Sequence, residues 1–142
     1  MRELIPYILA ILVGIFTTME ASINSQLGKM VTPKIATLHS LITGLFIILI
    51  INIASGSLSQ YGKVFYVKPY WLVGGIFGAL IVYIVIKIIP YLGITVTLTF
   101  IIASQVLSSF YIDTFIFRND KLGMMKIIGA LLIIAGVYFI SE

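Results

Sequence analysis

Cysteine is absent from this chain of 142 residues, and charged residues make up only 10% of it. The lack of cysteine excludes disulfide bonds, thiolate metal sites and cysteine nucleophiles. The scarcity of charge accompanies a hydrophobic content of 61%, whereas soluble domains are roughly one quarter charged. Water is therefore not the main solvent of the chain, and we expect a lipid bilayer around it.

Catalytic signatures are also lacking. The chain has one His, no metal-ligand spacing, no phosphate-binding loop, and no Ser in a motif with His and Asp. The nine Lys and Arg residues give a net charge of +4, but they stand singly between apolar runs, as cations beside membrane spans do. We expect no enzymatic activity, no cofactor, no bound metal and no nucleic-acid partner.

Long apolar runs are what the chain has. A helix that crosses a bilayer needs about 20 mostly apolar residues. A four-span interpretation would make 71–117 one span plus a re-entrant piece, but that region is long enough for two spans. The sequence predicts an all-α integral membrane protein, with a single transmembrane domain over 1–142 and five spans at about 4–27, 35–54, 71–89, 94–117 and 123–140.

The connections between spans differ in length. The longest polar stretch, 55–68, is expected to be the main external loop, and the aromatic residues around it are typical of an interfacial belt: Tyr61, Tyr66, Tyr70 and Trp71. The segment 90–93 reads Pro-Tyr-Leu-Gly and predicts a tight turn between antiparallel neighbours.

The positive-inside rule gives only a weak preference for one orientation in the membrane. The N-terminal side carries six cations, and the other side carries Lys29, Lys34 and Lys87. The six are Arg2, Lys63, Lys68, Arg118, Lys121 and Lys126. The bias favours a cytoplasmic N-terminus, yet it is small enough for insertion in both orientations, which would permit an antiparallel homodimer.

Glu20 is a carboxylate inside the first expected span. An acid near the bilayer centre costs about 2.5 to 3.5 kcal/mol on insertion scales and usually marks a pathway or site. Helical spacing puts Thr17, Glu20 and Asn24 on one face, which Gly28 continues. The alternative is a structural Glu that is neutralised by protonation, or bonded to Asn24 or to a neighbouring helix. A low dielectric disfavours a bare negative charge, which lets such a carboxylate exchange a proton for a cation.

Further polar residues lie on the other spans. His39 and Thr43 are four apart at the start of the second span, with Ser40 and Gly44 beside them, and are within expected reach of Glu20 or Asn24. His39 fits an interfacial hydrogen bond as well as a proton relay. In the third span, Tyr83 is the deepest aromatic ring that can face a cation. Glycines at the start of this span predict a packing seam or a hinge.

The fourth span carries a second polar stripe. Gln105, Ser109 and Asp113 recur at helical spacing, with Ser108 beside them, and Gln105 is the deepest. Asp113 stands near the end of the span, where it fits contact with headgroups or with Arg118. The fifth span has only small and apolar residues in its middle and is assigned to the scaffold.

Together these segments resemble the YdcZ-like family of the drug/metabolite transporter superfamily. The similarity covers nearly the whole chain and is carried by Glu20-Ala-Ser-Ile-Asn-Ser-Gln-Leu-Gly28, by the glycine-rich 71–78, by 89–93, by Ser104-Gln105 through Asp113, and by Gly129 with Gly136-Val137. The resemblance implies a bacterial inner-membrane transporter of a small molecule. It also implies that five spans form half of a ten-helix inverted-repeat assembly, as an antiparallel homodimer or with a paralogue.

The chain departs from that pattern at two positions. Many relatives have Gln in place of Glu20 and Gly in place of Ile116. A Gln cannot exchange a proton, so either the family is not uniformly proton-coupled or this member is closer to the small multidrug resistance branch, whose first helix carries an essential Glu.

Three functions remain open at this stage. The leading hypothesis is a secondary exporter of a small cationic or metabolite-like molecule, proton-coupled through Glu20 with alternating access. A passive dual-topology channel and a non-transporting assembly subunit are the alternatives. The residues expected to line the substrate and proton site are Glu20, Asn24, Thr17, His39, Thr43, Tyr83, Gln105 and Ser108.

Overall fold

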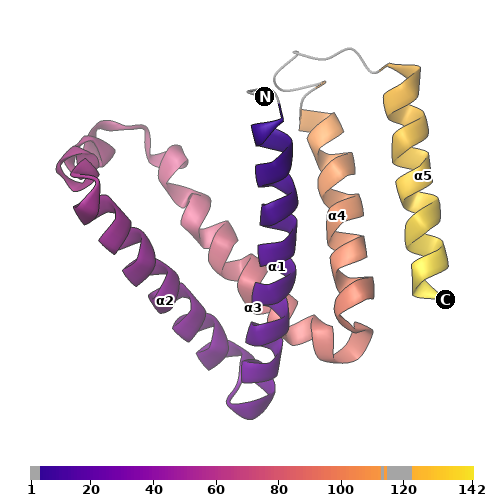
Figure 1. Cartoon of the computed structure of the whole chain (residues 1–142), viewed down its shortest axis with the longest axis horizontal. Coiled ribbons are helices and arrows are strands. Elements are labelled where there is room, and N and C mark those ends of the chain that lie inside the picture. Colours follow the sequence, from indigo (N-terminus) through magenta and orange to yellow (C-terminus); the bar gives the residue numbers. More distant parts are fainter. Residues whose placement is uncertain (1–3, 113, 115–122) are drawn as a thin grey trace. The chain divides into compact units, whose positions relative to one another are not determined.

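The computed structural model describes residues 4–112, 114 and 123–142, and within them every regular element is a helix (Figure 1). The elements are α1 (Ile5–Met30), α2 (Pro33–Ala54), the 3₁₀ helices η1 (Ser57–Tyr66) and η2 (Pro69–Val73), α3 (Gly74–Leu92), α4 (Ile94–Tyr111) and α5 (Met124–Ser141). The chain divides into two compact units, Met1–Pro90 and Tyr91–Glu142.

The helices have the length and composition of membrane spans. Among the described residues, four helices are long and apolar enough to cross a bilayer: α1, α2, the continuous Pro69–Leu92 and α4. No more than 11% of any of these spans is buried within the chain, so their apolar side chains face outward. This pattern confirms an all-α membrane protein, because such a surface is stable only against lipid or another apolar partner. That the shorter apolar stretch Ile127–Ser141 in α5 also crosses stays a prediction.

In the first unit, α1 and α2 form an antiparallel hairpin with a very short turn. Helix α1 continues to Met30, three residues past the expected end at 27. Pro33 begins α2, because a proline at the first helical position loses no hydrogen bond, and the Thr32 hydroxyl caps the helix by accepting from the Ile35 N–H at 3.3 Å. In Figure 1 the two helices meet at this turn and draw apart away from it.

Small residues let three helices meet near that turn. A Cβ added at Gly28 of α1 would lie 2.5 Å from Ile86 Cγ2 of α3 and 3.8 Å from Ala36 Cβ of α2. Ile86 and Ala36 are both buried. A methyl group at this position would overlap Ile86, so the glycine allows α1 and α3 to approach closely here.

The expected external loop at 55–68 is folded. Gly56, with φ of +70°, turns the chain out of α2, and η1 and η2 then fill most of the segment before α3 begins. Ten consecutive residues of 3₁₀ helix are longer than the usual run of three or four. The predicted loop is thus largely helical, and its place outside the membrane stays a prediction.

The expected turn at 90–93 is narrower than predicted. Helix α3 runs through Pro90 to Leu92, and the break is Gly93 alone, whose φ of +79° and ψ of +163° are essentially restricted to glycine. In the second unit α4 follows this break and packs beside α5 (Figure 1). Several residues of the sequence predictions lie outside the described residues: Arg2, Asp113, Ile116, Arg118, Lys121 and the side chain of Lys126.

Candidate functional site

Three polar side chains meet within the α1–α2 hairpin. Asn24 Nδ2 donates to Ser40 Oγ at 2.9 Å and to Glu20 Oε1 at 3.4 Å. Ser40 Oγ donates to the same Glu20 Oε1 at 3.4 Å. The acid, the amide and the hydroxyl therefore form a closed triangle, which we call the Glu20 cluster.

Local geometry explains why these residues meet. Glu20 and Asn24 are one helical turn apart, so their side chains stack on one face of α1. In an antiparallel hairpin, residues at equal distance from the turn face each other, and Asn24 and Ser40 are each eight residues from Thr32. Gly28 and Ala36, each four residues away, make the closer approach described above.

The cluster lies deep along α1. Glu20 is ten residues from the end of the helix at Met30, which corresponds to roughly 15 Å of helix and half of a bilayer about 30 Å thick. Asn24 is only 8% exposed, Ser40 is half-buried, and Glu20 is exposed on the surface of this single chain. The Glu20 carboxylate thus lies where α1 and α2 begin to separate.

One oxygen of the carboxylate is left available. Both hydrogen bonds converge on Oε1, and within the described part of the chain Oε2 has no hydrogen-bond partner. A carboxylate held through one oxygen is oriented by the protein while the other oxygen stays open to a proton or a cation. An intramembrane acid of this kind is a functional-site hypothesis by default, because its burial in lipid is costly unless a ligand or partner compensates it.

The other predicted residues on these two helices bond elsewhere. Thr17 Oγ1 donates to the Val13 carbonyl at 2.8 Å, and Thr43 Oγ1 donates to the His39 carbonyl at 2.9 Å. Both hydroxyls are satisfied by the preceding turn of their own helix, as Ser and Thr commonly are in spans. The imidazole of His39 is exposed and makes no contact with the cluster. Their roles in a site stay predictions.

The remaining predicted residues lie on other elements. Tyr83 is half-buried on α3, and its hydroxyl makes no hydrogen bond to any described residue. Gln105 and Ser108 are exposed on α4, which belongs to the second unit, whereas the hairpin belongs to the first. Tyr70, expected in the interfacial aromatic belt, faces a cation of its own chain, with Lys68 Nζ 5.9 Å from its ring centroid.

Ser40 is a residue of the site that the sequence pattern does not single out. The residues predicted on this helix are His39 and Thr43, whereas Ser40 is the one whose hydroxyl donates to Glu20. The signal available in the sequence is the symmetry of the hairpin about Thr32, which pairs Asn24 with Ser40 rather than with His39 or Thr43.

The glycines of α3 and α5 have no packing partner in the described part of the chain. A Cβ added at any of the glycines of α3 or α5 would meet no described atom within 4 Å, at Gly74, Gly75, Gly78, Gly129 or Gly136. These small-residue faces are open. No group of three potential metal-ligating side chains occurs among the described residues.

The fold and the site thus define a helical, polytopic membrane protein with a functional-site candidate, an oriented carboxylate, midway along its first span. The chain itself belongs to the family described as "Putative inner membrane exporter, YdcZ", which matches residues 5–139. It is accordingly a multi-pass protein of the inner membrane. Searches among curated proteins and among solved structures give no match.

Proposed function

We propose that the chain is a secondary active exporter in which a proton and a small cationic substrate compete for Glu20. One observation carries the proposal: Asn24 and Ser40 hold Oε1 of an intramembrane carboxylate and leave Oε2 free. Membership of an exporter family supports the direction of transport.

Competition at one carboxylate is sufficient for coupling. When Glu20 is ionised, its negative charge attracts a cation, and when it is protonated, that attraction is lost. By thermodynamic reciprocity, the proton weakens substrate binding by the same factor as the substrate weakens proton binding. A site that opens alternately to the two faces then exchanges one for the other.

Alternating access requires a second body against which the hairpin can move. We propose that two copies assemble antiparallel, so that five spans in each give ten, and that one copy rocks against the other around the site. The open glycine faces on α3 and α5 support such an assembly, because small residues allow close helix packing in membranes. A paired paralogue would satisfy the same geometry.

The other polar residues would line the substrate pathway around Glu20. In this proposal they supply hydroxyl, imidazole, amide and ring contacts that shape specificity, while the carboxylate carries the coupling. They are Thr17, Asn24, His39, Thr43, Tyr83, Gln105 and Ser108.

Replacing Glu20 tests the proposal directly. In proteoliposomes with an imposed proton gradient, the unaltered protein should accumulate a lipophilic cation such as tetraphenylphosphonium above its equilibrium level. Glu20→Gln keeps the size and a hydrogen-bonding group but cannot lose a proton, so accumulation should fall to the level of empty vesicles. Glu142→Gln, at the C-terminal end of α5, is the matched control and should transport normally.

Two results would contradict the proposal. Gradient-driven accumulation that persists in Glu20→Gln would remove the carboxylate from the mechanism. Fast flux that only equalises concentrations, with no response to the proton gradient, would identify a passive channel instead.

A further inference from the structure

The segment from Ser55 to Val73 carries positive charge without any acid. Lys63 and Lys68 are its only ionisable side chains apart from tyrosines. Large rings beside them are strongly exposed, with Tyr66 at 91%, Phe65 at 80% and Trp71 at 70%. Exposed aromatic rings beside lysines at the end of a span are the composition of a surface that meets lipid headgroups.

The 3₁₀ geometry of η1 separates its side chains into edges. At three residues per turn, Gln60 and Lys63 follow each other along one edge, and Leu58 and Tyr61 follow each other along the next. An edge that carries Gln60 and the Lys63 cation therefore runs beside a more apolar edge.

A groove lies between η1 and the C-terminal half of α2. Its volume is about 510 Å³, within the range of about 300–1,000 Å³ typical of small-molecule sites. Its lining is apolar along α2 and becomes polar toward η1: Leu45, Ile48, Leu49, Asn52, Ser57, Leu58, Gln60 and Tyr61. The apolar end lies inside a candidate membrane span, and the polar end lies beyond it.

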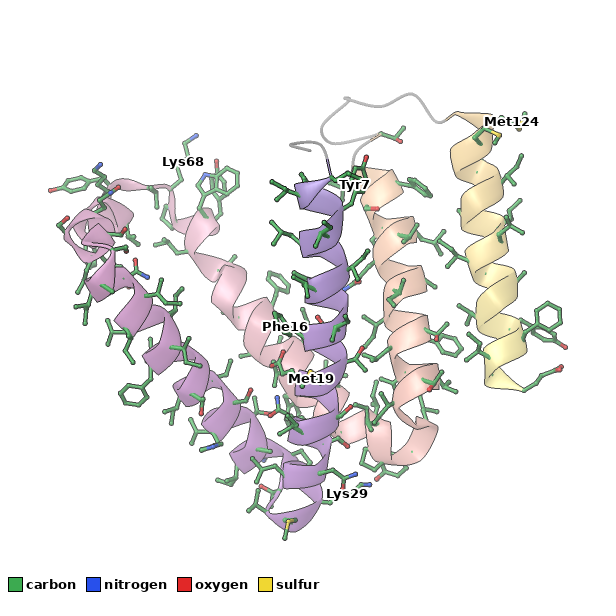
Figure 2. All side chains as sticks on the ribbon, in the orientation of Figure 1. Tyr7, Phe16, Met19, Lys29, Lys68 and Met124 are labelled. Atoms are coloured by element: carbon green, nitrogen blue, oxygen red, sulfur yellow. The ribbon has the colours of Figure 1, made fainter. Side chains whose placement is uncertain are left out.

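Lys68 adds a second cation at this end of the hairpin. Figure 2 shows Lys68 at the end opposite to Lys29, with its side chain directed away from the ribbon. Its ammonium lies 5.9 Å from the Tyr70 ring centroid, and the Tyr70 and Trp71 rings are 5.1 Å apart. The side chain of Trp71 is therefore close to this cation.

We propose that this groove binds an anionic phospholipid, with one acyl chain along Leu45, Ile48 and Leu49 and the phosphate near Lys63 and Lys68. The occupant must be apolar where the groove lies in the span and negatively charged where the lysines stand. A phospholipid with an anionic headgroup meets both requirements. Free phosphate has no apolar part, and a second copy paired antiparallel would bring further lysines, Lys29 and Lys34, to this end rather than negative charge.

Bound lipid would hold η1 flat against the membrane surface and fix the end of α2. This inference is independent of the Glu20 cluster, which lies toward the other end of the hairpin. It concerns how the protein is seated in its membrane and not what it transports.

Trp71 provides a direct readout because it is the only tryptophan in the chain. The full-length protein in detergent micelles is titrated with phosphatidylglycerol or phosphatidylethanolamine brominated near the top of the acyl chain, and quenching of Trp71 fluorescence is recorded. Micelles remove any effect of membrane orientation. Brominated phosphatidylglycerol should quench at clearly lower concentrations than the zwitterionic lipid.

The two lysines should account for that preference. With Lys63→Gln and Lys68→Gln together, the half-quenching concentration of phosphatidylglycerol should rise about 25-fold, since each cation near an anionic headgroup contributes roughly a fivefold gain. Arg at both positions should restore the preference. The control, Lys29→Gln with Lys34→Gln at the opposite end of the hairpin, should leave it unchanged.

The groove is tested separately from the charges. Ile48→Phe narrows the groove and should weaken quenching by phosphatidylglycerol severalfold with both lysines intact, whereas Ile47→Phe, one residue away and outside the lining, should not. The proposal is overturned by equal quenching from the two lipids, by an equal loss in the Lys29/Lys34 control, or by an Ile48→Phe variant that behaves as the unaltered protein.

Discussion

Ser40 and Thr43 are hydroxyl residues of the same helix, one turn apart, and they differ in what their hydroxyls bond. Ser40 Oγ reaches across to Glu20 Oε1, while Thr43 Oγ1 donates to a carbonyl of its own helix. Only Ser40 is therefore positioned to influence the carboxylate. This contrast gives a matched pair of variants.

Ser40→Ala should weaken cation binding to the Glu20 cluster about fivefold. The variant removes one hydrogen bond to Glu20 and one from Asn24, and a net hydrogen bond is worth roughly 1 kcal/mol. Binding of tetraphenylphosphonium to the purified protein, followed by equilibrium dialysis, gives the change in affinity. Thr43→Ala should bind within twofold of the unaltered protein, and equal losses in both variants would contradict the assigned role of Ser40.

A residue of the site could be predicted from the sequence where the geometry of a single helix places it near Glu20, and not where tertiary structure does. Asn24 was predictable because one helical turn fixes its distance from Glu20 regardless of tertiary structure. Ser40 was not singled out, because its approach depends on how tightly the chain turns at Val31-Thr32. Gln105 and Ser108 lie in the second unit, and no local pattern relates them to Glu20.

At the scale of elements, the crossing of α1 and α3 rests on the contact between Gly28 and Ile86. Gly14 of the same helix has open space where its Cβ would be. The two glycines thus share a helix and a residue type but differ in their surroundings.

Gly28→Ala should destabilise the protein by about 1–3 kcal/mol, since the added methyl would overlap Ile86 Cγ2. Thermal unfolding in detergent measures the loss as a lowered midpoint. Gly14→Ala should be neutral or slightly stabilising. Ile86→Leu keeps the volume and removes the Cγ2 branch, so the double variant with Gly28→Ala should recover part of the loss. No recovery would mean that the α1–α3 contact is not the cause.

The sequence predicted the presence of the long helices better than the residues at which they begin and end. Long apolar runs identified the spans, because hydrophobic burial in lipid depends on composition along the chain. The segment at 55–68 was not recognised as helical, since a 3₁₀ helix has no apolar periodicity comparable to that of an α-helix and its residues are polar and glycine-containing. The extension of α3 past Pro90 was missed because proline ends a helix more often than it sits in the last turn.

At the scale of the whole molecule, the charge distribution predicts insertion in both orientations. Reporters fused to the N-terminus should be active on both faces of the inner membrane, in comparable amounts. Lys29→Gln with Lys34→Gln leaves a single cation on that side and should favour one orientation strongly. A single orientation in the unaltered protein would contradict the antiparallel homodimer while leaving the transport proposal intact.

The tight turn between α1 and α2 has a consequence for comparing chains of this kind. One residue inserted between Met30 and Pro33 would rotate α2 by about 100° relative to α1, carry Ser40 away from Asn24 and replace Ala36 opposite Gly28. The number of residues separating the amide from the hydroxyl is therefore as much a part of this site as their identity. In a sequence comparison, a gap of one residue in this turn would be a stronger sign of altered chemistry than several conservative substitutions in the helices.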